Sequence, residues 1–163
     1  MIWKKTYLEA SLLIIAPYSG RKMNNMKKNI TIDINSIPTQ IEYSEGNLHV
    51  VGLMDEPFGA IKSGKKTIEI RANSDDRPFD YSIIKANHNL RFMNERTGKV
   101  IDTKVVRVSH YPNIKRLFEM EGTENTLSVP WTVAQGIELI HSFPGYKESI
   151  VKHGVYAIEI ETT

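Results

Sequence analysis

The chain has 163 residues, an apolar fraction of 40% and a net charge of +2, which suit a single globular domain with a sizeable core. It contains no cysteine, which excludes disulfides, thiolate catalysis and cysteine-containing zinc sites and favours a reducing compartment, the cytoplasm. Residues 1–30 hold six basic groups and one acid, whereas the remainder holds 15 Lys and Arg against 18 Asp and Glu. The main domain is therefore slightly acidic, which argues against a large duplex-binding surface.

Residues 1–29 are predicted to be a disordered or mis-assigned N-terminal leader. Leu8–Ala16 is apolar, but Glu9 interrupts it, no small-residue cleavage pattern follows, and it is too short to span a bilayer. We therefore expect no membrane segment and place the domain at residues 30–163.

Three strands and a helix are expected at the start of this domain. Residues 30–34 alternate between isoleucine and polar residues, and residues 39–43 and 48–51 flank a Ser-Glu-Gly-Asn loop that is typical of a β-hairpin. A helix is expected over residues 55–64, with Asp55 as N-cap, a first-turn proline and a glycine at its end.

The next stretch, residues 64–71, reads GKKTIEIR and is the main candidate for function. As a strand it sends Ile68 and Ile70 into a core, and it places Thr67, Glu69 and Arg71 together on the opposite face. The lysines before it open onto this polar face, where an anion or a polar base edge could be held. The alternative is structural: Lys62, Lys65 and Lys66 form a solvated turn, and Glu69 pairs with Arg71.

The remaining pattern completes an α+β chain. Residues 73–80 form a polar loop, either a lid or an exposed turn. Asn87 is expected in the left-handed conformation of a turn before the next strand, and residues 96–99 turn a second hairpin whose return strand covers residues 100–108. Asn113 is expected to cap a helix that ends at Gly122.

A further helix over residues 133–142 and a last strand over residues 155–161 follow. The predicted fold is a mixed, partly closed β-barrel of about five to six strands with two to three short helices.

Residues 48–161 resemble the ASCH domain, a branch of the PUA-like superfamily. The family signature GxKxxExR is matched at Gly64, Lys66, Glu69 and Arg71. The segments 108–122 and 154–161 are also similar to the family's later strand and helix and to its final strand. The resemblance implies a cleft beside the signature that suits RNA or a nucleoside, and in some small members an amidohydrolase that acts on acetylated cytidine.

The first functional interpretation is therefore binding of RNA, a nucleotide or a nucleoside. Lys66 and Arg71 would contact phosphate or a base acceptor, Glu69 would accept from an exocyclic amine, and Tyr111 would either stack on a base or lie in the core. The ligand-binding candidates are Gly64, Lys65, Lys66, Glu69, Arg71 and Tyr111.

The second interpretation is the amidohydrolase, which in the related members uses a lysine, a threonine and a glutamate. Lys66 matches the lysine, but Glu69 occupies the position of the threonine. Thr67 could replace that threonine only if the substrate moved by about 6–7 Å along the strand. Glu121, or less well Glu124, would supply the glutamate, so the candidate catalytic residues are Lys66, Glu69, Thr67 and Glu121.

A third interpretation is a non-catalytic interaction module whose signature charges brace the barrel. No metal or cofactor is expected, because the five histidines (His49, His88, His110, His141 and His153) lack metal-ligand spacing and no nucleotide-binding glycine motif is present. His88 follows the Asn87 turn where the resemblance leads one to expect an aspartate. The sequence names neither the exact ligand nor the oligomeric state.

Overall fold

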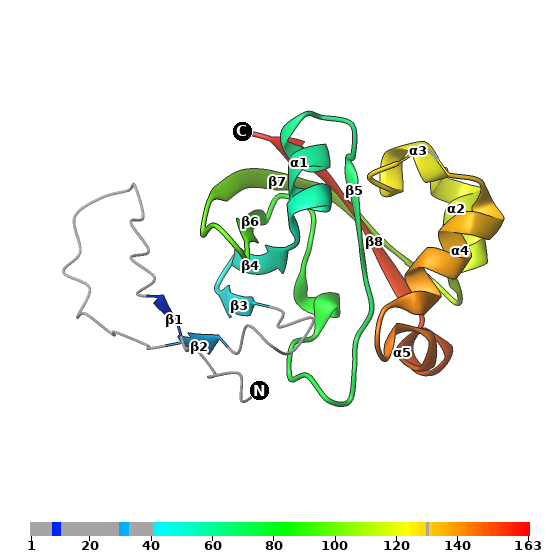
Figure 1. Cartoon of the computed structure of the whole chain (residues 1–163), viewed down its shortest axis with the longest axis horizontal. Helices are drawn as coiled ribbons and strands as arrows, with labels where there is room; N and C mark the ends of the chain where they lie inside the picture. The colour runs from blue at the N-terminus through cyan, green and yellow to red at the C-terminus, as the bar shows by residue number, and fades with distance from the viewer. Residues whose placement is uncertain (1–7, 11–29, 33–40, 130) are drawn as a thin grey trace, which may run out of the picture. The chain divides into compact units, whose positions relative to one another are not determined.

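The computed structural model describes residues 8–10, 30–32, 41–129 and 131–163, and the chain divides into two compact units, residues 1–39 and 40–163 (Figure 1). In the first unit, β1 (Leu8–Ala10) pairs antiparallel with β2 (Ile30–Ile32). β2 confirms the beginning of the strand predicted from residue 30. The rest of that strand, and the predicted leader apart from β1, lie outside the described residues.

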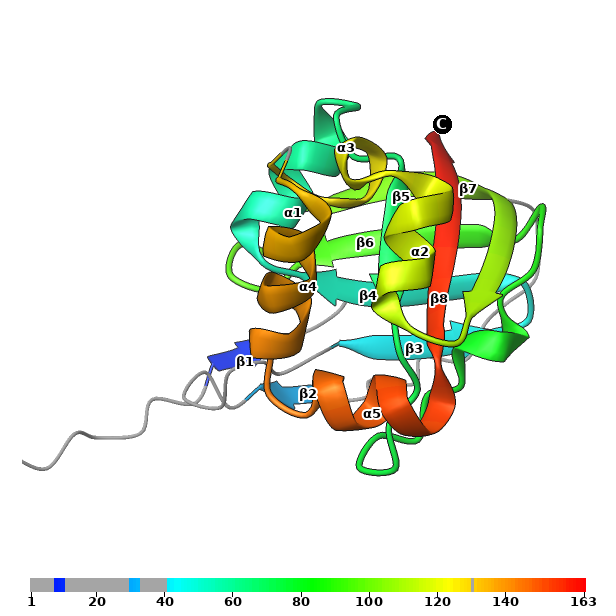
Figure 2. The same cartoon turned by 90° about the vertical axis from the view of Figure 1, so that its right-hand side faces the viewer.

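The second unit contains a six-stranded sheet in the order β3-β4-β6-β7-β8-β5. Its strands are β3 (Glu42–Glu45), β4 (Leu48–Leu53), β5 (Ile68–Arg71), β6 (Asn89–Asn94), β7 (Val100–Tyr111) and β8 (Val155–Thr162). β4 and β6 run parallel, and the other neighbours run antiparallel. The sheet curls into a half-barrel, which confirms the predicted α+β class and the mixed, partly closed barrel (Figure 2).

A β-bulge helps this sheet to curl. The pairing of β7 with β8 shifts between Val105 and Arg107, so one extra residue, Val106, lies in β7 at that point. Such a bulge bends its strand and increases the local twist. The long strand β7 can therefore pair with β6 near its start and follow β8 to its end.

Among the described residues, five α-helices and one 3₁₀ helix connect the strands. They are α1 (Asp55–Lys62), η1 (Tyr81–Ile83), α2 (Ile114–Glu121), α3 (Thr123–Thr126), α4 (Val133–Ser142) and α5 (Tyr146–His153). α1, α2 and α4 confirm the predicted helices, whereas η1, α3 and α5 were not predicted. α2 to α5 gather on one side of β5 and β8, away from α1 (Figure 1). In the part of the chain that the structure describes, none of the helices has the length and apolar content needed to cross a bilayer.

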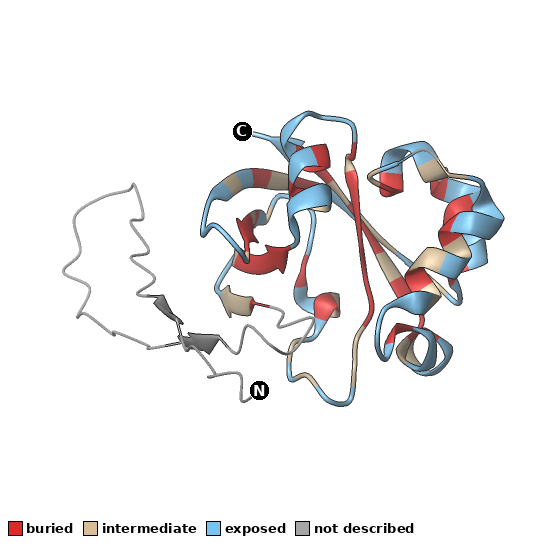
Figure 3. Ribbon diagram, in the orientation of Figure 1, coloured by how far each residue is buried: buried red, intermediate tan, exposed pale blue. Residues whose placement is uncertain are grey.

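The sheet has a hydrophobic core on each face (Figure 3). On one face, Ile68 and Ile70 of β5 pack with Leu117 and Phe118 of α2. On the other, Phe58 of α1 belongs to the core inside the half-barrel. β5 is consequently buried on both faces.

Local capping agrees with the sequence at α2 and differs at α1. The Asn113 side chain accepts a hydrogen bond from the Arg116 N–H at 2.8 Å, as an N-cap does. The predicted N-cap Asp55 is wrong: Met54 holds that position, and Asp55 accepts from Asn94 Nδ2 at 2.8 Å and Arg96 Nε at 2.6 Å. Asp55 therefore fastens the start of α1 to the turn after β6 instead of to its own helix.

Candidate functional site

The candidate site is built on β5, where the predicted alternation is confirmed. Ile68 and Ile70 belong to the core on the helical side, and Glu69 and Arg71 face the inside of the half-barrel. Lys66, Glu69 and Arg71 are 7%, 4% and 2% exposed, so the alternative that placed Lys66 in a solvated turn is wrong. Charged side chains are rarely buried to this extent unless they are paired.

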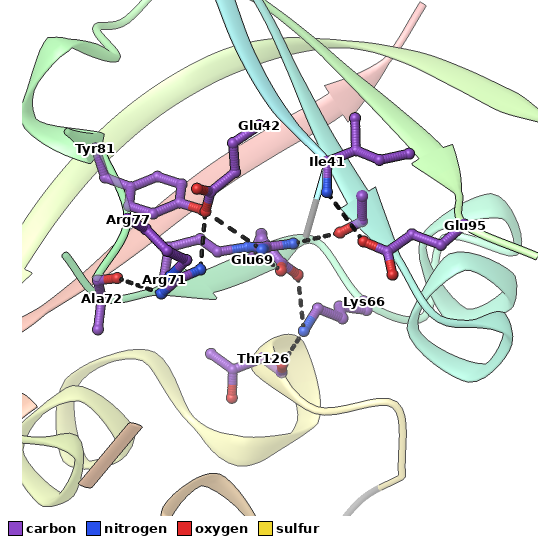
Figure 4. A network of polar contacts seen from close by, with 11 residues as sticks. Ile41, Glu42, Lys66, Glu69, Arg71, Ala72, Arg77, Tyr81, Glu95 and Thr126 are labelled. Atoms are coloured by element: carbon purple, nitrogen blue, oxygen red, sulfur yellow. Dashed lines mark hydrogen bonds and ion pairs between the residues drawn. The ribbon is translucent and has the colours of Figure 1, made fainter. Parts of the chain in front are cut away.

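Glu69 lies between the two cations (Figure 4). Arg71 Nε donates to Glu69 Oε1 at 2.8 Å, and Lys66 Nζ lies 3.1 Å from Glu69 Oε2. The hydrogen bond of the Lys66 ammonium goes to the Thr126 carbonyl oxygen at 2.7 Å, at the end of α3. The Lys66 ammonium thus neutralises Glu69 at Oε2, and the Arg71 guanidinium does so at Oε1.

Glu69 is ionised in this setting. Burial alone would raise the pKa of its carboxyl group, but the charges of Lys66 and Arg71 outweigh that effect and hold the pKa below its usual value of 4.5. An ionised carboxylate accepts hydrogen bonds, and its lowered pKa makes it a poor general base at neutral pH. The site is therefore suited to hold a donor group rather than to remove a proton.

Arg71 connects β5 to the opposite side of the half-barrel. Its Nη2 donates to the Gly52 carbonyl oxygen in β4 at 2.8 Å, and its Nη1 lies 3.5 Å from the Tyr81 hydroxyl in η1. Tyr81 in turn donates to Glu42 of β3, and Arg77 Nη1 donates to the same carboxylate at 2.9 Å. Burial raises the pKa of Tyr81 well above its usual range, so its hydroxyl keeps the proton that it donates.

The turn before β5 separates Lys65 from the signature lysine, Lys66. Gly64 has a φ of 76°, a left-handed conformation that glycine adopts without strain, and its N–H donates to the Ile61 carbonyl at 3.0 Å. Lys65 is exposed, whereas Lys66 turns inward. Of the two predicted lysine ligands, Lys66 joins Glu69 and Arg71, and Lys65 faces solvent.

Thr67 is half-buried directly before β5 and is held through its backbone. Its N–H donates to the Asn125 carbonyl at 3.0 Å, and its carbonyl accepts from the Ile160 N–H at 2.9 Å. These bonds join the start of β5 to the α3 segment and to β8.

Glu121 and Tyr111 form a second cluster around Arg107. Arg107 Nη1 and Nη2 donate to the two Glu121 carboxylate oxygens at 2.7 and 2.6 Å, and the Tyr111 hydroxyl donates to Oε1 at 2.5 Å. Arg107 also pairs with Glu159, which lies opposite Ile68 in the sheet and so on the helical face. The hydrogen bonds from Arg107 lower the pKa of Glu121. The predicted site residues thus divide between the two faces of the sheet, because the partners of Glu121 are Arg107 and Tyr111 instead of Lys66.

Several site residues were missed from the sequence. Thr126, Tyr81 and Gly52 contact the signature charges, and Arg107 binds Glu121. Two of them contribute only a backbone carbonyl, which leaves no signal in the side-chain pattern. Among the described residues, no group of three His, Asp or Glu side chains is placed to hold a metal ion.

The half-barrel and the buried Lys-Glu-Arg cluster define a PUA-like domain of the mixed α+β type. A family model for the ASCH domain matches residues 51–163, and the chain belongs to that family. This confirms the resemblance drawn from the signature.

Several solved structures are similar to this chain, and two of them are 30% or more identical to it. The crystal structure of hypothetical protein PH0355 is 33% identical, with a TM-score of 0.55, and the match covers 69% of this chain and 95% of that one. The solution structure of PF0455 from Pyrococcus furiosus is 32% identical, with a TM-score of 0.51, over 68% of this chain and 93% of that one. No curated protein matches the chain in a sequence comparison.

Proposed function

We propose that this ASCH domain binds a nucleoside, a nucleotide or a short single-stranded RNA, with one base edge placed against Lys66 and Glu69. The observation that carries the proposal is Glu69 Oε2, a buried and ionised oxygen whose ionic partner is the Lys66 ammonium, 3.1 Å away. A carboxylate oxygen has two lone-pair sites, so a bound amino group can donate to Oε2 beside the Lys66 ammonium.

Lys66 supplies the complementary group. An ammonium carries three N–H donors, and the Thr126 carbonyl accepts one of them. The remaining N–H groups lie beside Glu69 Oε2. An amino group next to a ring nitrogen or carbonyl, as on the Watson–Crick edge of an unpaired base, matches such an adjacent acceptor and donor.

A ligand must displace part of the protein to reach this pair. Lys66 and Glu69 are buried, and Lys66 is held to the end of α3 by a single hydrogen bond. We expect binding to move the Lys66 side chain from Thr126 toward the ligand, which exchanges one hydrogen bond for another. The slightly acidic domain and the absence of cysteine agree with a cytoplasmic protein that recognises a small target.

A structural role of the same charges is the second candidate. The observation that favours it is the contact from Arg71 in β5 to Gly52 in β4, which links two strands across the half-barrel. In that case the cluster stabilises the fold and binds nothing.

A titration with matched lysine variants separates these candidates. Fluorescence anisotropy of a labelled eight-nucleotide single-stranded RNA is recorded for the wild type, Lys66→Met and Lys65→Ala, with urea unfolding to confirm that each variant is folded. Binding at Glu69 predicts a loss of at least about tenfold in affinity for Lys66→Met, which is about 1.4 kcal/mol, and little change for Lys65→Ala. Equal affinities for all three proteins contradict the proposal, and a wild type that binds no RNA and no cytidine supports the structural role.

The amidohydrolase is tested in the same series. Purified protein is incubated with acetylated cytidine, and release of acetate is followed by chromatography. Turnover that Lys66→Met and Thr67→Val both remove would identify an enzyme with Lys66 and Thr67 as reacting groups. Turnover that remains in Glu121→Gln would show that Glu121 supplies no catalytic carboxylate, as its bonds to Arg107 lead us to expect.

A further inference from the structure

A hydrogen-bonded line of three side chains lies in the half-barrel, outside the signature cluster. Ser44 of β3 and His49 of β4 are directly opposite in the hairpin, and Ser44 Oγ lies 2.8 Å from His49 Nδ1. The other ring nitrogen, His49 Nε2, lies 2.8 Å from His88 Nδ1. The left-handed residue Asn87, with φ of 68°, precedes His88 and turns the chain into β6.

A backbone group sets the direction of the protons along this line. The Lys85 N–H donates to His88 Nδ1 at 3.3 Å, so that nitrogen carries a lone pair. His49 Nε2 must therefore carry the proton of the bond between the two rings. His49 Nδ1 is then an acceptor, and the Ser44 hydroxyl donates to it.

The surroundings favour this arrangement. His49 is 1% exposed, and the Phe79 ring stands edge-on to it at 6.5 Å, whereas Ser44 is partly exposed. Burial, and then the neighbouring His88, lower the pKa of His49, so the imidazole is neutral at pH 7. The partly exposed Ser44 hydroxyl thus donates to the buried, neutral imidazole of His49, and His88 orients that imidazole.

We propose that Ser44 is the nucleophile of a second site, with His49 as its general base and His88 as the positioning residue, and that this site transfers acyl groups from small esters to water. The residue types and both hydrogen bonds meet the geometric requirements of an activated serine. The proposal is independent of ligand binding at Lys66, because no hydrogen bond or ion pair joins Ser44 or His49 to the signature charges among the described residues.

The reaction conserves atoms and protons in two steps. In the first, Ser44 Oγ attacks the ester carbonyl, its proton passes to His49 Nδ1, and the alcohol leaves with that proton. In the second, His49 Nδ1 takes a proton from water, the resulting hydroxide cleaves the acyl–Ser44 bond, and the proton returns to Ser44 as the acid departs. His88 keeps the His49 ring in the required tautomer throughout.

Labelling with a fluorophosphonate probe tests the nucleophile on the full chain. The wild type is expected to react at Ser44, as mapped by peptide mass spectrometry, and Ser44→Ala to lose the label. Removal of the base in His49→Gln should slow labelling by about 100-fold, the usual contribution of a general base. His110→Gln removes an exposed imidazole that is bonded to the His153 carbonyl, and it should label at the wild-type rate.

Two outcomes of the labelling experiment would overturn the proposal. A wild type that the probe does not label at Ser44, or an equal rate in folded His49→Gln, overturns the proposal. The role of His88 is tested with His88→Gln. This variant should label more slowly than the wild type and should have a melting temperature close to that of the wild type. A parallel loss of both would reduce His88 to a structural residue and overturn its positioning role.

A second measurement covers the case in which His49→Gln does not fold. The chain has no cysteine, so Ser44→Cys introduces a single thiol. Beside a neutral imidazole this thiol should ionise at lower pH than the partly exposed control Ser149→Cys, as measured by the rate of iodoacetamide alkylation against pH. Equal thiol pKa values in the two variants would overturn the proposal.

Discussion

At the scale of single residues, Glu69 neutralises the buried positive charges of its neighbours. It is the carboxylate in ionic contact with both Lys66 and Arg71, and all three side chains are buried. Glu69→Gln would leave two buried cations without this negative charge. We expect the free energy of unfolding to fall by about 3–5 kcal/mol, as is typical when one partner of a buried ion pair is removed.

Urea unfolding at pH 7 measures this loss. Glu148→Gln, an exposed acid in the first turn of α5, is the matched control and should alter stability by less than about 0.5 kcal/mol. Similar stabilities of Glu69→Gln and Glu148→Gln would show that Glu69 is not the neutralising partner that its distances indicate.

The lowered pKa of Glu69 also predicts a dependence on pH. A carboxyl group whose pKa is lower in the folded state stabilises the fold above the usual value of 4.5, and this stabilisation is lost as the pH falls through the folded pKa. The stability difference between wild type and Glu69→Gln should therefore shrink on acidification below about pH 4.5. Urea midpoints from pH 7 to pH 3 measure it, and a difference that stays constant would contradict the assigned charge.

Asn87 offers a test of backbone strain. It is exposed and has a φ of 68°, which a side chain with a Cβ adopts at a cost that Asn partly avoids. Asn87→Ala should lose about 1 kcal/mol of stability, whereas Asn87→Gly should lose none. Thermal unfolding of the two variants compares them, and a more stable alanine variant would exclude the left-handed turn.

Backbone conformation at single residues could be predicted from the sequence, whereas the burial and contacts of their side chains could not. The alternation of Ile68 with Glu69 and the left-handed Asn87 follow from local rules, and both are found. Burial of Glu69 could not be predicted, because it depends on Gly52, Tyr81 and Thr126, which come from distant segments. Placing Tyr111 and Glu121 beside Lys66 failed for the same reason.

At the scale of elements, the packing of α2 against α4 depends on Gly136. A Cβ built at Gly136 would lie 2.9 Å from Phe118 Cε2 and 3.0 Å from Leu127 Cδ1. Gly136→Ala should therefore destabilise the protein by about 1–3 kcal/mol, because the overpacking outweighs the better helix propensity of alanine.

Gly59 in α1 is the matched control, since a Cβ there would meet nothing within 4 Å. Gly59→Ala should gain up to about 1 kcal/mol from helix propensity. Opposite signs of the two changes, measured by urea unfolding, are the expected outcome. A stabilising Gly136→Ala would show that α2 and α4 have room to separate.

Elements with their own boundary signals were predicted, and elements without them were missed. α2 begins at the capping residue Asn113, and α4 begins at a capping box of Thr132 and Gln135. α5 has Gly145 at its N-cap and no capping side chain, and it is held by the buried residues Tyr146 and Ile150. Tertiary packing determines such a helix, and a single sequence contains little trace of it.

At the scale of the whole molecule, Arg71 links the two ends of the sheet. β5 is one edge of the half-barrel and β3 is the other, and Arg71 reaches from β5 to Gly52 in β4 and toward Tyr81, which binds β3. Lysine cannot reproduce the fork of a guanidinium. Arg71→Lys should lose about 3 kcal/mol of stability, as expected for a disrupted buried pair.

Hydrogen exchange locates this loss. Amides of β5 should exchange faster in Arg71→Lys than in the wild type, whereas Arg91→Lys, which alters an ion pair with Asp102 between β6 and β7, should leave β5 unchanged. A uniform increase over all strands in Arg71→Lys would indicate global destabilisation without a local opening of the edge.

The fold class could be recognised from the sequence, but the order of the strands could not. The family signature and the later segments led to the mixed half-barrel, which the structure and the ASCH match confirm. Local patterns did not indicate that β5 pairs with β8 instead of with β4, the strand before it in the chain. The pairing of strands far apart in the chain is decided by the assembled core.

The pairing of β5 with β8 has a consequence for how the protein is made. A ribosome completes β5 early, but the strand that β5 pairs with in the sheet follows only after residues 72–154 have been synthesised. Until then Ile68 and Ile70 lack their β8 neighbours. The nascent chain therefore exposes the apolar and charged side chains of β5. The barrel is therefore completed late in translation, and interactions between sequence-distant segments make that step slow.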